Sequence, residues 1–199
     1  MPAVCSLSSG TSAPVLAMTK SELRRELRAL PPLPPDVAAE KSDRICARLI
    51  KSSAWLRARV VALYAADAHE PDLGALWAGK GDRMFCFPRV DGDRATGERL
   101  DFYRVDTAAE LLLSRWGLYE PPRDLARQVD PVHIDLVIVP GVAFTANGER
   151  LGRGRGHYDR FLASLSQHAA TIGICFTNRL LPSLPTEPHD RRIDQVIAE

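Results

Sequence analysis

The chain has 199 residues, 45% of them hydrophobic and 26% charged, which is ordinary for a globular protein and enough for one α/β domain with a complete core. The formal net charge of +1 provides no overall field that would attract nucleic acid or an anionic membrane, so any bound anion must be held by a local cluster. No apolar run reaches the roughly 18 residues that a membrane span needs.

The N-terminal segment 1–17 is rich in serine, alanine, proline and threonine and shows no periodicity. We therefore expect a disordered extension, followed by one α/β domain over residues 18–199. The segment lacks the basic start and long apolar core of a signal peptide. Met18 directly precedes a helix start, and we hypothesise that it is the biological first residue. N-terminal sequencing of the native protein would test this, and a native chain that begins at residue 1 or 2 would refute it.

Two helices are predicted first. The pair Thr19 and Glu22 has the spacing of a capping box, and leucines at helical spacing follow over 19–30. The proline-rich stretch 31–35 ends this helix. A second helix is predicted over 36–52, with Asp36 as its cap and an inward face that comprises Ala38, Ile45, Leu49 and Ile50.

Strands then alternate with short helices along the chain. Strands are predicted over 59–66, 83–88, 99–103, 134–140, 171–176 and 194–197, with a turn at Asp91-Gly92-Asp93. Short helices are predicted over 72–77 and 108–113. A longer helix is predicted over 156–168, because Tyr158, Phe161, Leu162 and Leu165 share one face. This order predicts a three-layer α/β fold: a mostly parallel sheet flanked by helices on both faces, in a single domain.

Four cysteines are present, at widely spaced positions with no CxxC pair: Cys5, Cys46, Cys86 and Cys175. This spacing does not suit a zinc site, whose ligands come in closer pairs. We expect free thiols in a reducing compartment, and hence a cytoplasmic protein.

The chemistry concentrates in the stretch from Val139 to Leu162. Three glycines, Gly152, Gly154 and Gly156, alternate with arginines between a buried strand and a helix. Glycines let main-chain N–H groups approach a ligand, and a helix N-terminus adds positive potential. Arginines add donors that bind phosphate in pairs. The pattern therefore predicts a polyphosphate site at the carboxyl end of a strand, although a solvated basic loop would have the same sequence pattern.

Better-known phosphate loops do not match this stretch. There is no GxxxxGK[ST] run, and glycines at every second position are not GxGxxG. A nucleic-acid-binding Arg-Gly segment would be longer, and the balanced net charge argues against that function.

The stretch resembles the signature of the 5-formyltetrahydrofolate cyclo-ligase (methenyltetrahydrofolate synthetase) family. From Pro140 it reads PGVAFTANGERLGRGRGHYDRFL. Further segments that resemble family elements are Lys20–Arg24, Tyr64–Asp72, Trp116–Pro121 and Glu187–Asp190. The resemblance covers the chain from about residue 18 to its end.

The resemblance implies ATP- and Mg²⁺-dependent cyclisation of 5-formyltetrahydrofolate to 5,10-methenyltetrahydrofolate, with release of ADP and phosphate. The formyl oxygen would attack the γ-phosphate of ATP, and N10 would then close the ring as phosphate leaves. The protein would chiefly position the reactants and neutralise charge. Its partners would be the folate and ATP, with neither nucleic acid nor membrane, and we expect a monomer.

The resemblance also implies roles for single residues. ATP would be bound by Lys20, Arg24, Arg150, Leu151, Gly152, Arg153, Gly154, Arg155, Gly156, His157 and Tyr158. Catalysis would fall to Arg153, Arg155, His157 and Tyr158. Folate would contact Ala65, Glu70, Trp116, Arg155 and His157, with Glu70 accepting hydrogen bonds from the pterin edge. Asp159 and Asp190 would hold Mg²⁺ directly or through water, and His189 would orient Asp190.

Simpler structural interpretations remain open for several of these residues. Lys20 and Arg24 would also suit a solvated helix face, and Glu70 the end of a strand. Trp116 would suit a core, Asp159 the first turn of a helix, and Asp190 a pairing with a neighbouring arginine.

His157 departs from the family pattern, which has tyrosine at this position. Histidine can stack, donate hydrogen bonds and carry charge near neutral pH, so the change bears on affinity and pH profile more than on the reaction class. It keeps two alternatives open: a divergent family member that binds nucleotide or folate without closing the ring, and a non-enzymatic binding regulator.

Overall fold

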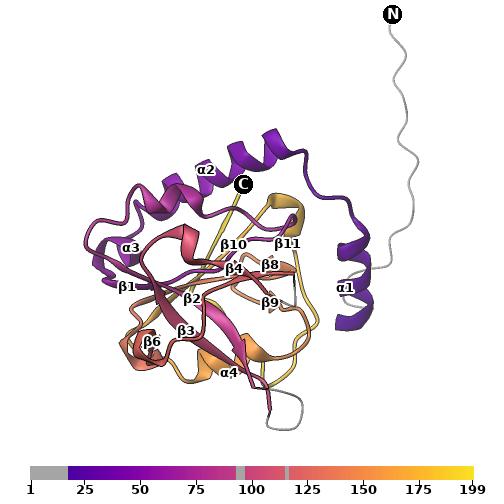
Figure 1. Ribbon diagram of the computed structural model, residues 1–199. Helices are drawn as coiled ribbons and strands as arrows, with labels where there is room; N and C mark the ends of the chain where they lie inside the picture. The colour runs from indigo at the N-terminus through magenta and orange to yellow at the C-terminus, as the bar shows by residue number, and fades with distance from the viewer. Residues whose placement is uncertain (1–17, 93–96, 115–116) are drawn as a thin grey trace, which may run out of the picture.

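The computed structural model describes residues 18–92, 97–114 and 117–199 (Figure 1). At its centre is a seven-stranded sheet with the order β12-β10-β7-β1-β2-β3-β6. These strands are β1 (Val60–Ala62), β2 (Met84–Asp91), β3 (Arg99–Val105), β6 (Gln128–Val129), β7 (Leu136–Val139), β10 (Ala170–Cys175) and β12 (Gln195–Ala198). The strands from β12 to β2 run parallel, and β3 and β6 add an antiparallel edge. The predicted mostly parallel sheet is confirmed.

Both faces of the central strands are buried, and for this reason their sequences read as continuous apolar runs. In β7, Leu136 and Ile138 face one side of the sheet, whereas Val137 and Val139 face the other. All four side chains are fully buried.

Helices cover both faces. On one side, α2 (Pro35–Leu49) and α3 (Ser53–Arg57) contribute Ile45, Leu49 and Trp55 to a core with Leu136 and Ile138. On the other side, α4 (His157–Ala163) packs Phe161 into the core that contains Val137 and Val139. Figure 1 shows α2 and α4 on opposite sides of the sheet, so the three-layer prediction is confirmed.

A second, three-stranded sheet of order β11-β8-β9 lies between the main sheet and α1 (Lys20–Ala29) (Figure 1). It comprises β8 (Ala143–Thr145), β9 (Arg150–Leu151) and β11 (Leu180–Leu181). Leu23 and Leu27 of α1 pack against Leu151 and Leu184. The predicted capping box is present: Glu22 N donates to Thr19 Oγ1 at 3.3 Å, and Thr19 N donates to the Glu22 carboxylate at 2.8 Å. These contacts fix α1 beside the segment that carries the glycine-arginine loop.

The remaining elements are short. A two-stranded hairpin joins β4 (Leu112–Leu113) to β5 (Tyr119–Glu120). The 3₁₀ helices are η2 (Gly74–Trp77), η3 (Ala108–Glu110), η4 (Leu125–Arg127), η5 (Pro131–His133) and η6 (Thr177–Arg179).

Several boundaries differ from the sequence expectations. In α2 the cap position is Pro34, so Asp36 lies in the first turn, and Ile50 is exposed where an inward side chain was expected. The predicted helix 108–113 is a 3₁₀ turn followed by β4. The predicted helix 156–168 ends at Ala163, where the Ser164 hydroxyl donates to the Phe161 carbonyl and competes with the next helical turn.

Other sequence expectations concern single positions. The strand predicted over 59–66 is confined to Val60–Ala62. Cys46, Cys86 and Cys175 are free and buried, as expected. The expectations for the extension 1–17, for Asp93 and for Trp116 fall outside the described residues. No helix in the described part of the chain combines the length and apolarity needed to cross a bilayer.

Candidate active site

A cleft of about 960 Å³ opens at the carboxyl ends of the central strands. Its walls come from α1, from the segments after β1 and β7, from β2 and β3, from the β5 hairpin and from the loop around 185–190. Ligands of open α/β sheets bind at this edge. The fold therefore gathers segments that are far apart in sequence around the glycine-arginine loop.

The glycines of this loop are required by its geometry. Gly154 and Gly156 have positive φ of 102° and 65°, a region that disfavours side chains. A Cβ on Gly152 would lie 2.8 Å from Nη1 of Arg150. The loop therefore exposes main chain to the cleft, as the sequence predicted.

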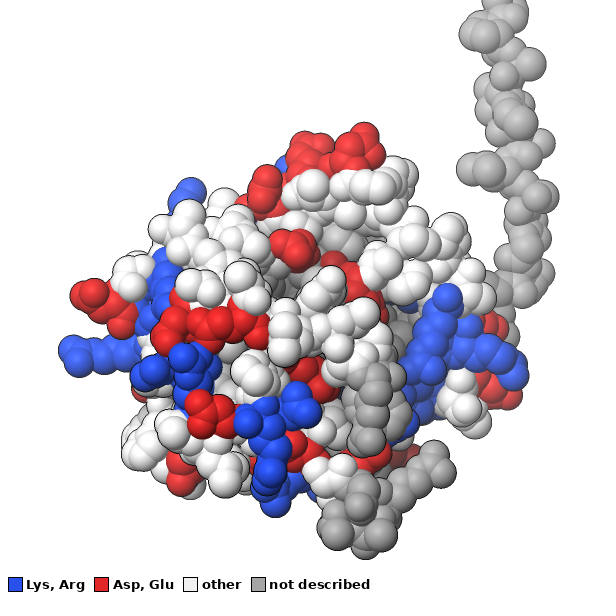
Figure 2. Space-filling model, viewed as in Figure 1, with Lys and Arg blue, Asp and Glu red and all other residues white. Residues whose placement is uncertain are grey.

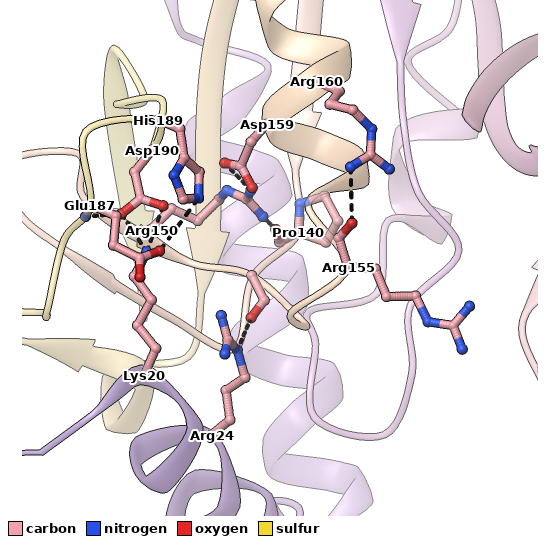
Figure 3. Close-up of polar contacts among 11 residues, drawn as sticks. Lys20, Arg24, Pro140, Arg150, Arg155, Asp159, Arg160, Glu187, His189 and Asp190 are labelled. Carbon is pink, nitrogen blue, oxygen red and sulfur yellow. Dashed lines mark hydrogen bonds and ion pairs between the residues drawn. The ribbon is translucent and has the colours of Figure 1, made fainter. Parts of the chain in front are cut away.

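Two arginines of α1 hold the loop in place through hydrogen bonds. Arg24 Nε donates to the Gly152 carbonyl at 2.7 Å (Figure 3), and Arg28 Nη2 donates to the Arg153 carbonyl at 3.1 Å. Because α1 binds these carbonyl oxygens, the loop is held in a position in which its main-chain N–H groups can bind an anion.

Lys20 joins α1 to the 185–190 loop (Figure 3). Its Nζ lies 2.6 Å from Asp190 Oδ2 and 2.8 Å from Glu187 Oε2. Asp190 also accepts from Glu187 N at 2.7 Å. Partial burial would raise the pKa of Asp190, but the Lys20 and main-chain hydrogen bonds outweigh burial and lower it. The carboxylate is thus ionised at neutral pH and faces the cleft.

Glu187, His189 and Asp190 bring three ligand atoms within 4.8 Å of one another. His189 Nε2 lies 3.4 Å from Glu187 Oε2. Asp190 is oriented by Lys20 and by the Glu187 main chain, and among the described residues it makes no hydrogen bond to His189 and no ion pair with a neighbouring arginine. The cluster is a candidate cation site.

Arg150 is almost fully buried, with its side chain 4% exposed. Its Nη2 donates to Asp159 Oδ1 at 2.8 Å (Figure 3). Its guanidinium lies 5.6 Å from the centre of the Tyr158 ring. Within the described residues, Arg150 Nε and the Tyr158 hydroxyl are buried without a hydrogen-bond partner. Buried polar atoms are seldom left unpaired, so these two are candidates for ligand contact.

Arg153 pairs with two carboxylates on the segment after β1. Its Nη2 lies 2.7 Å from Asp67 Oδ2 and 3.0 Å from Glu70 Oε1. Burial raises the pKa of Glu70 and Arg153 partly offsets it. A buried, hydrogen-bonded carboxylate of this kind suits the recognition of N–H groups.

Arg155 and His157 meet at one carboxylate. Arg155 Nη1 lies 2.8 Å, and His157 Nε2 3.4 Å, from the same oxygen of Glu98. In Figure 3 the Arg155 side chain extends away from Lys20 and Arg24. Burial lowers the pKa of His157, so the imidazole is neutral at pH 7.

The structure brings most of the predicted site residues to one cleft. Those that line it are Lys20, Arg24, Ala65, Glu70, Arg150, Gly152, Arg153, Gly154, Arg155, Gly156, His157, Tyr158, Asp159 and Asp190. Leu151 does not line it: its side chain is buried against α1, which leaves its ATP role to the main chain. Trp116 lies outside the described residues.

Sequence reasoning assigned no role to Asp67, Glu98 and Glu187, which pair with the predicted basic residues. Glu187 stood within a quoted motif, and its place three residues before Asp190 was the only available signal. Asp67 also lay within a segment that resembles a family element, whereas Glu98 gave no signal, because its partner Arg155 is distant in sequence. Asp159 and Asp190 also have different partners, Arg150 and Lys20, and the structure does not group them in one cluster.

Comparison with known proteins agrees with this arrangement. The sequence profile of the 5-formyltetrahydrofolate cyclo-ligase family matches residues 17–199. The chain is 29% identical over 181 residues to a 5-formyltetrahydrofolate cyclo-ligase of Escherichia coli, covering 88% of this chain and 95% of that one. It is 24% identical over 191 residues to the cyclo-ligase of Mus musculus, covering 90% and 91%. The solved structure of an Aquifex aeolicus 5,10-methenyltetrahydrofolate synthetase superposes with a TM-score of 0.75 at 28% identity, covering 91% and 90% of the two chains.

Proposed function

We infer, because this chain belongs to the 5-formyltetrahydrofolate cyclo-ligase family, that it is a ligase that closes 5-formyltetrahydrofolate to 5,10-methenyltetrahydrofolate. The observation that carries this function is the single cleft in which a glycine-arginine loop faces the buried carboxylate of Glu70. Its volume of about 960 Å³ lies at the upper end of small-molecule sites, as a site for two substrates requires. The ATP and Mg²⁺ dependence, and the residue roles below, are part of the proposal.

The phosphate end of the cleft fits ATP. Gly152, Gly154 and Gly156 would present main-chain N–H groups, while Lys20 and Arg24 would contribute charge from α1. The unpartnered Nε of Arg150 provides a further donor at the same wall. A polyanion bound here would therefore be held by donors that the fold already fixes in place.

The donor set near Asp190 fits a hard cation. Asp190 and Glu187 supply carboxylate oxygens, the ligands that Mg²⁺ prefers, and Asp159 lines the same cleft. Bound there with ATP, Mg²⁺ would neutralise phosphate charge. Lys20 would then exchange its carboxylate partners for phosphate oxygens.

The part of the cleft around Glu70 suits the folate ring. Glu70 would accept hydrogen bonds from the pterin amino and ring N–H groups, Ala65 would line the pocket, and the unpartnered Tyr158 hydroxyl would supply a polar contact. A pterin here would lie beside Arg153, which already contacts Glu70. The formyl group and the γ-phosphate would therefore meet near Arg153.

Catalysis by this chain would consist of positioning and charge stabilisation. Glu70 holds the Arg153 guanidinium in place, and Glu98 does the same for Arg155, before any substrate binds. Each arginine can exchange a carboxylate for a phosphate oxygen with little reorganisation, which is the arrangement that favours transition states of phosphoryl transfer. His157, neutral at pH 7, can donate or accept a hydrogen bond beside Arg155.

We further propose that the protein acts in the cytoplasm as a monomer and binds neither nucleic acid nor membrane. The balanced net charge supports this, and on the face shown in Figure 2 basic and acidic side chains are interspersed.

The function is tested by mixing the protein with 5-formyltetrahydrofolate and MgATP and measuring methenyl product and ADP together. We expect one ADP for each methenyltetrahydrofolate and no ADP when folate is omitted. ADP without methenyl product would instead indicate the divergent family member, and binding without turnover a regulator. Omission of Mg²⁺ should abolish both products.

A further inference from the structure

A second, smaller cavity lies beside the cleft and is named here the arginine pocket. Its volume is about 210 Å³, roughly a fifth of the cleft. It is lined by three cations, Arg28, Arg153 and Arg179, and by Asp67, His69 and Glu70. Because Arg28, Arg153 and Glu70 line both cavities, the pocket adjoins the cleft at the point where Arg153 meets Glu70.

Arg179 gives the pocket a buried charge. The residue is 4% exposed; its Nη1 donates to the Leu27 carbonyl at 2.5 Å and its Nη2 to His69 Nδ1 at 3.2 Å. No carboxylate oxygen of the described residues lies within 4.0 Å of this guanidinium. Burial lowers the pKa of Arg179, and the charge of Asp67, which makes no ion pair with it, offsets this lowering only in part. A buried charge of this kind is stabilised by an anion.

The other polar groups of the pocket compensate this charge only in part, through the carboxylate of Asp67. An arginine cannot accept a hydrogen bond, so in this contact His69 Nδ1 is the acceptor and contributes no negative charge. Asp67 and Glu70 are already paired with Arg153. Three guanidinium groups face two carboxylates, which leaves a surplus of one positive charge.

The size of the pocket restricts what can enter. Since a water molecule occupies about 30 Å³ in the liquid, the cavity has room for about seven waters or one compact oxyanion, but not for a whole nucleotide. The guanidinium fork matches the oxygens of phosphate. The shared wall at Arg153 would let such an ion pass from the cleft.

We propose that the arginine pocket binds the inorganic phosphate that the reaction releases, separately from the ATP γ-phosphate position. This inference rests on the proposed function. In the ring-closing step the bond from N10 to the formyl carbon forms, N10 loses its proton, and the bond from that carbon to the phosphorylated oxygen breaks. Phosphate leaves with the former formyl oxygen, and Arg153 and Arg179 receive it while the methenyl product still fills the cleft.

The test is calorimetric titration of inorganic phosphate into the full-length protein saturated with Mg²⁺ and a non-hydrolysable ATP analogue. We expect phosphate to bind in the presence of the analogue. Arg179→Gln should weaken this binding by about tenfold or more, the effect of losing one hydrogen bond between charged groups. Arg28→Gln should weaken phosphate binding too. Because the Arg28 side chain is exposed, this variant should fold normally. Arg25→Gln, exposed on the same helix and lining neither cavity, should leave it unchanged.

Several results would overturn the proposal. Loss of phosphate binding once the analogue is bound would place phosphate at the γ-phosphate position. Equal phosphate affinity in Arg25→Gln and Arg28→Gln would also contradict it. So would tighter binding of glutamate than of phosphate, because the pocket would then prefer a carboxylate. A wild-type protein that fails to bind the analogue would refute the proposed function instead. The titration without nucleotide, compared between Arg179→Gln and Arg25→Gln, would then still test the pocket.

Discussion

The ion pair between Arg150 and Asp159 allows a sharp test of how the cleft wall is held. Asp159→Asn removes the carboxylate that contacts Arg150 Nη2 at 2.8 Å, while the Arg150 side chain stays 96% buried. Among the described residues Arg150 has no other ion pair within 4.0 Å. The substitution therefore leaves a buried guanidinium without its counter-ion.

The size of the effect follows from this burial. Removing one partner of a fully buried pair costs about 3–5 kcal/mol. Asp159 is itself 20% exposed, and asparagine keeps one oxygen as an acceptor, so we expect a loss of about 2 kcal/mol. For a domain of this size each kcal/mol lowers the midpoint of thermal unfolding by about 2–4 °C, which gives a decrease of about 4–8 °C.

The assay is urea and thermal unfolding of the ligand-free protein at pH 7. The matched control is Glu40→Gln, which breaks an exposed pair with Arg44 on α2 and should change the free energy of unfolding by less than about 0.5 kcal/mol. Equal changes in the two variants would refute the burial argument. The Mg²⁺ dependence of turnover gives a second measurement on Asp159→Asn. If Asp159 binds Mg²⁺, the half-saturating Mg²⁺ concentration of the variant should rise. If its role is purely structural, that concentration should stay constant.

Four further predictions concern the loop and its surroundings. Arg155→Ala should lower kcat by about 100-fold or more in the ADP-coupled assay while the protein stays folded; near-wild-type kcat would remove Arg155 from the mechanism. His157→Tyr should retain or improve turnover, and complete loss would give the histidine a dedicated role. Because burial lowers the pKa of His157 from 6.5, the unfolded chain binds its proton first, so the free energy of unfolding should fall as pH drops from 6.5 through the lowered pKa. His157→Gln should flatten that fall in urea titrations. Gly148→Ala should destabilise the protein by about 3 kcal/mol, since its Cβ at φ 84° would lie 2.0 Å from the Ile193 carbonyl oxygen; an unchanged urea midpoint would contradict this packing.

The parts of the fold that the sequence predicted well are those with a strong local signal. The run around Leu136–Val139 is apolar on both faces, and Thr19 with Glu22 has the spacing of a reciprocal cap; both signals agree with the structure. Strands of only two residues, such as β9, contain no full period of alternation and were missed. Leu165 continued the helical pattern, but the Ser164 hydroxyl bond at the end of α4 is a local competition that apolar periodicity does not register.

The candidate site also has a part that a local sequence signal predicts and a part that no local signal predicts. The glycine-arginine loop is contiguous, so its residues could be found together, although β8 and β9 stand between it and the buried strand that the sequence predicted before it. Glu98 and Arg179 contribute through partners distant in sequence, the former 57 residues from Arg155 and the latter 110 from His69. Such pairs depend on how the strands are ordered in the sheet, which no local pattern encodes.

The central claim, ring closure through transfer of the γ-phosphate to the formyl oxygen, is tested most directly with substrate carrying ¹⁸O in that formyl group. The protein should turn over this substrate with MgATP, and mass spectrometry of the released phosphate should show one ¹⁸O atom in each molecule formed. Unlabelled phosphate, with the label recovered in water, would contradict the account.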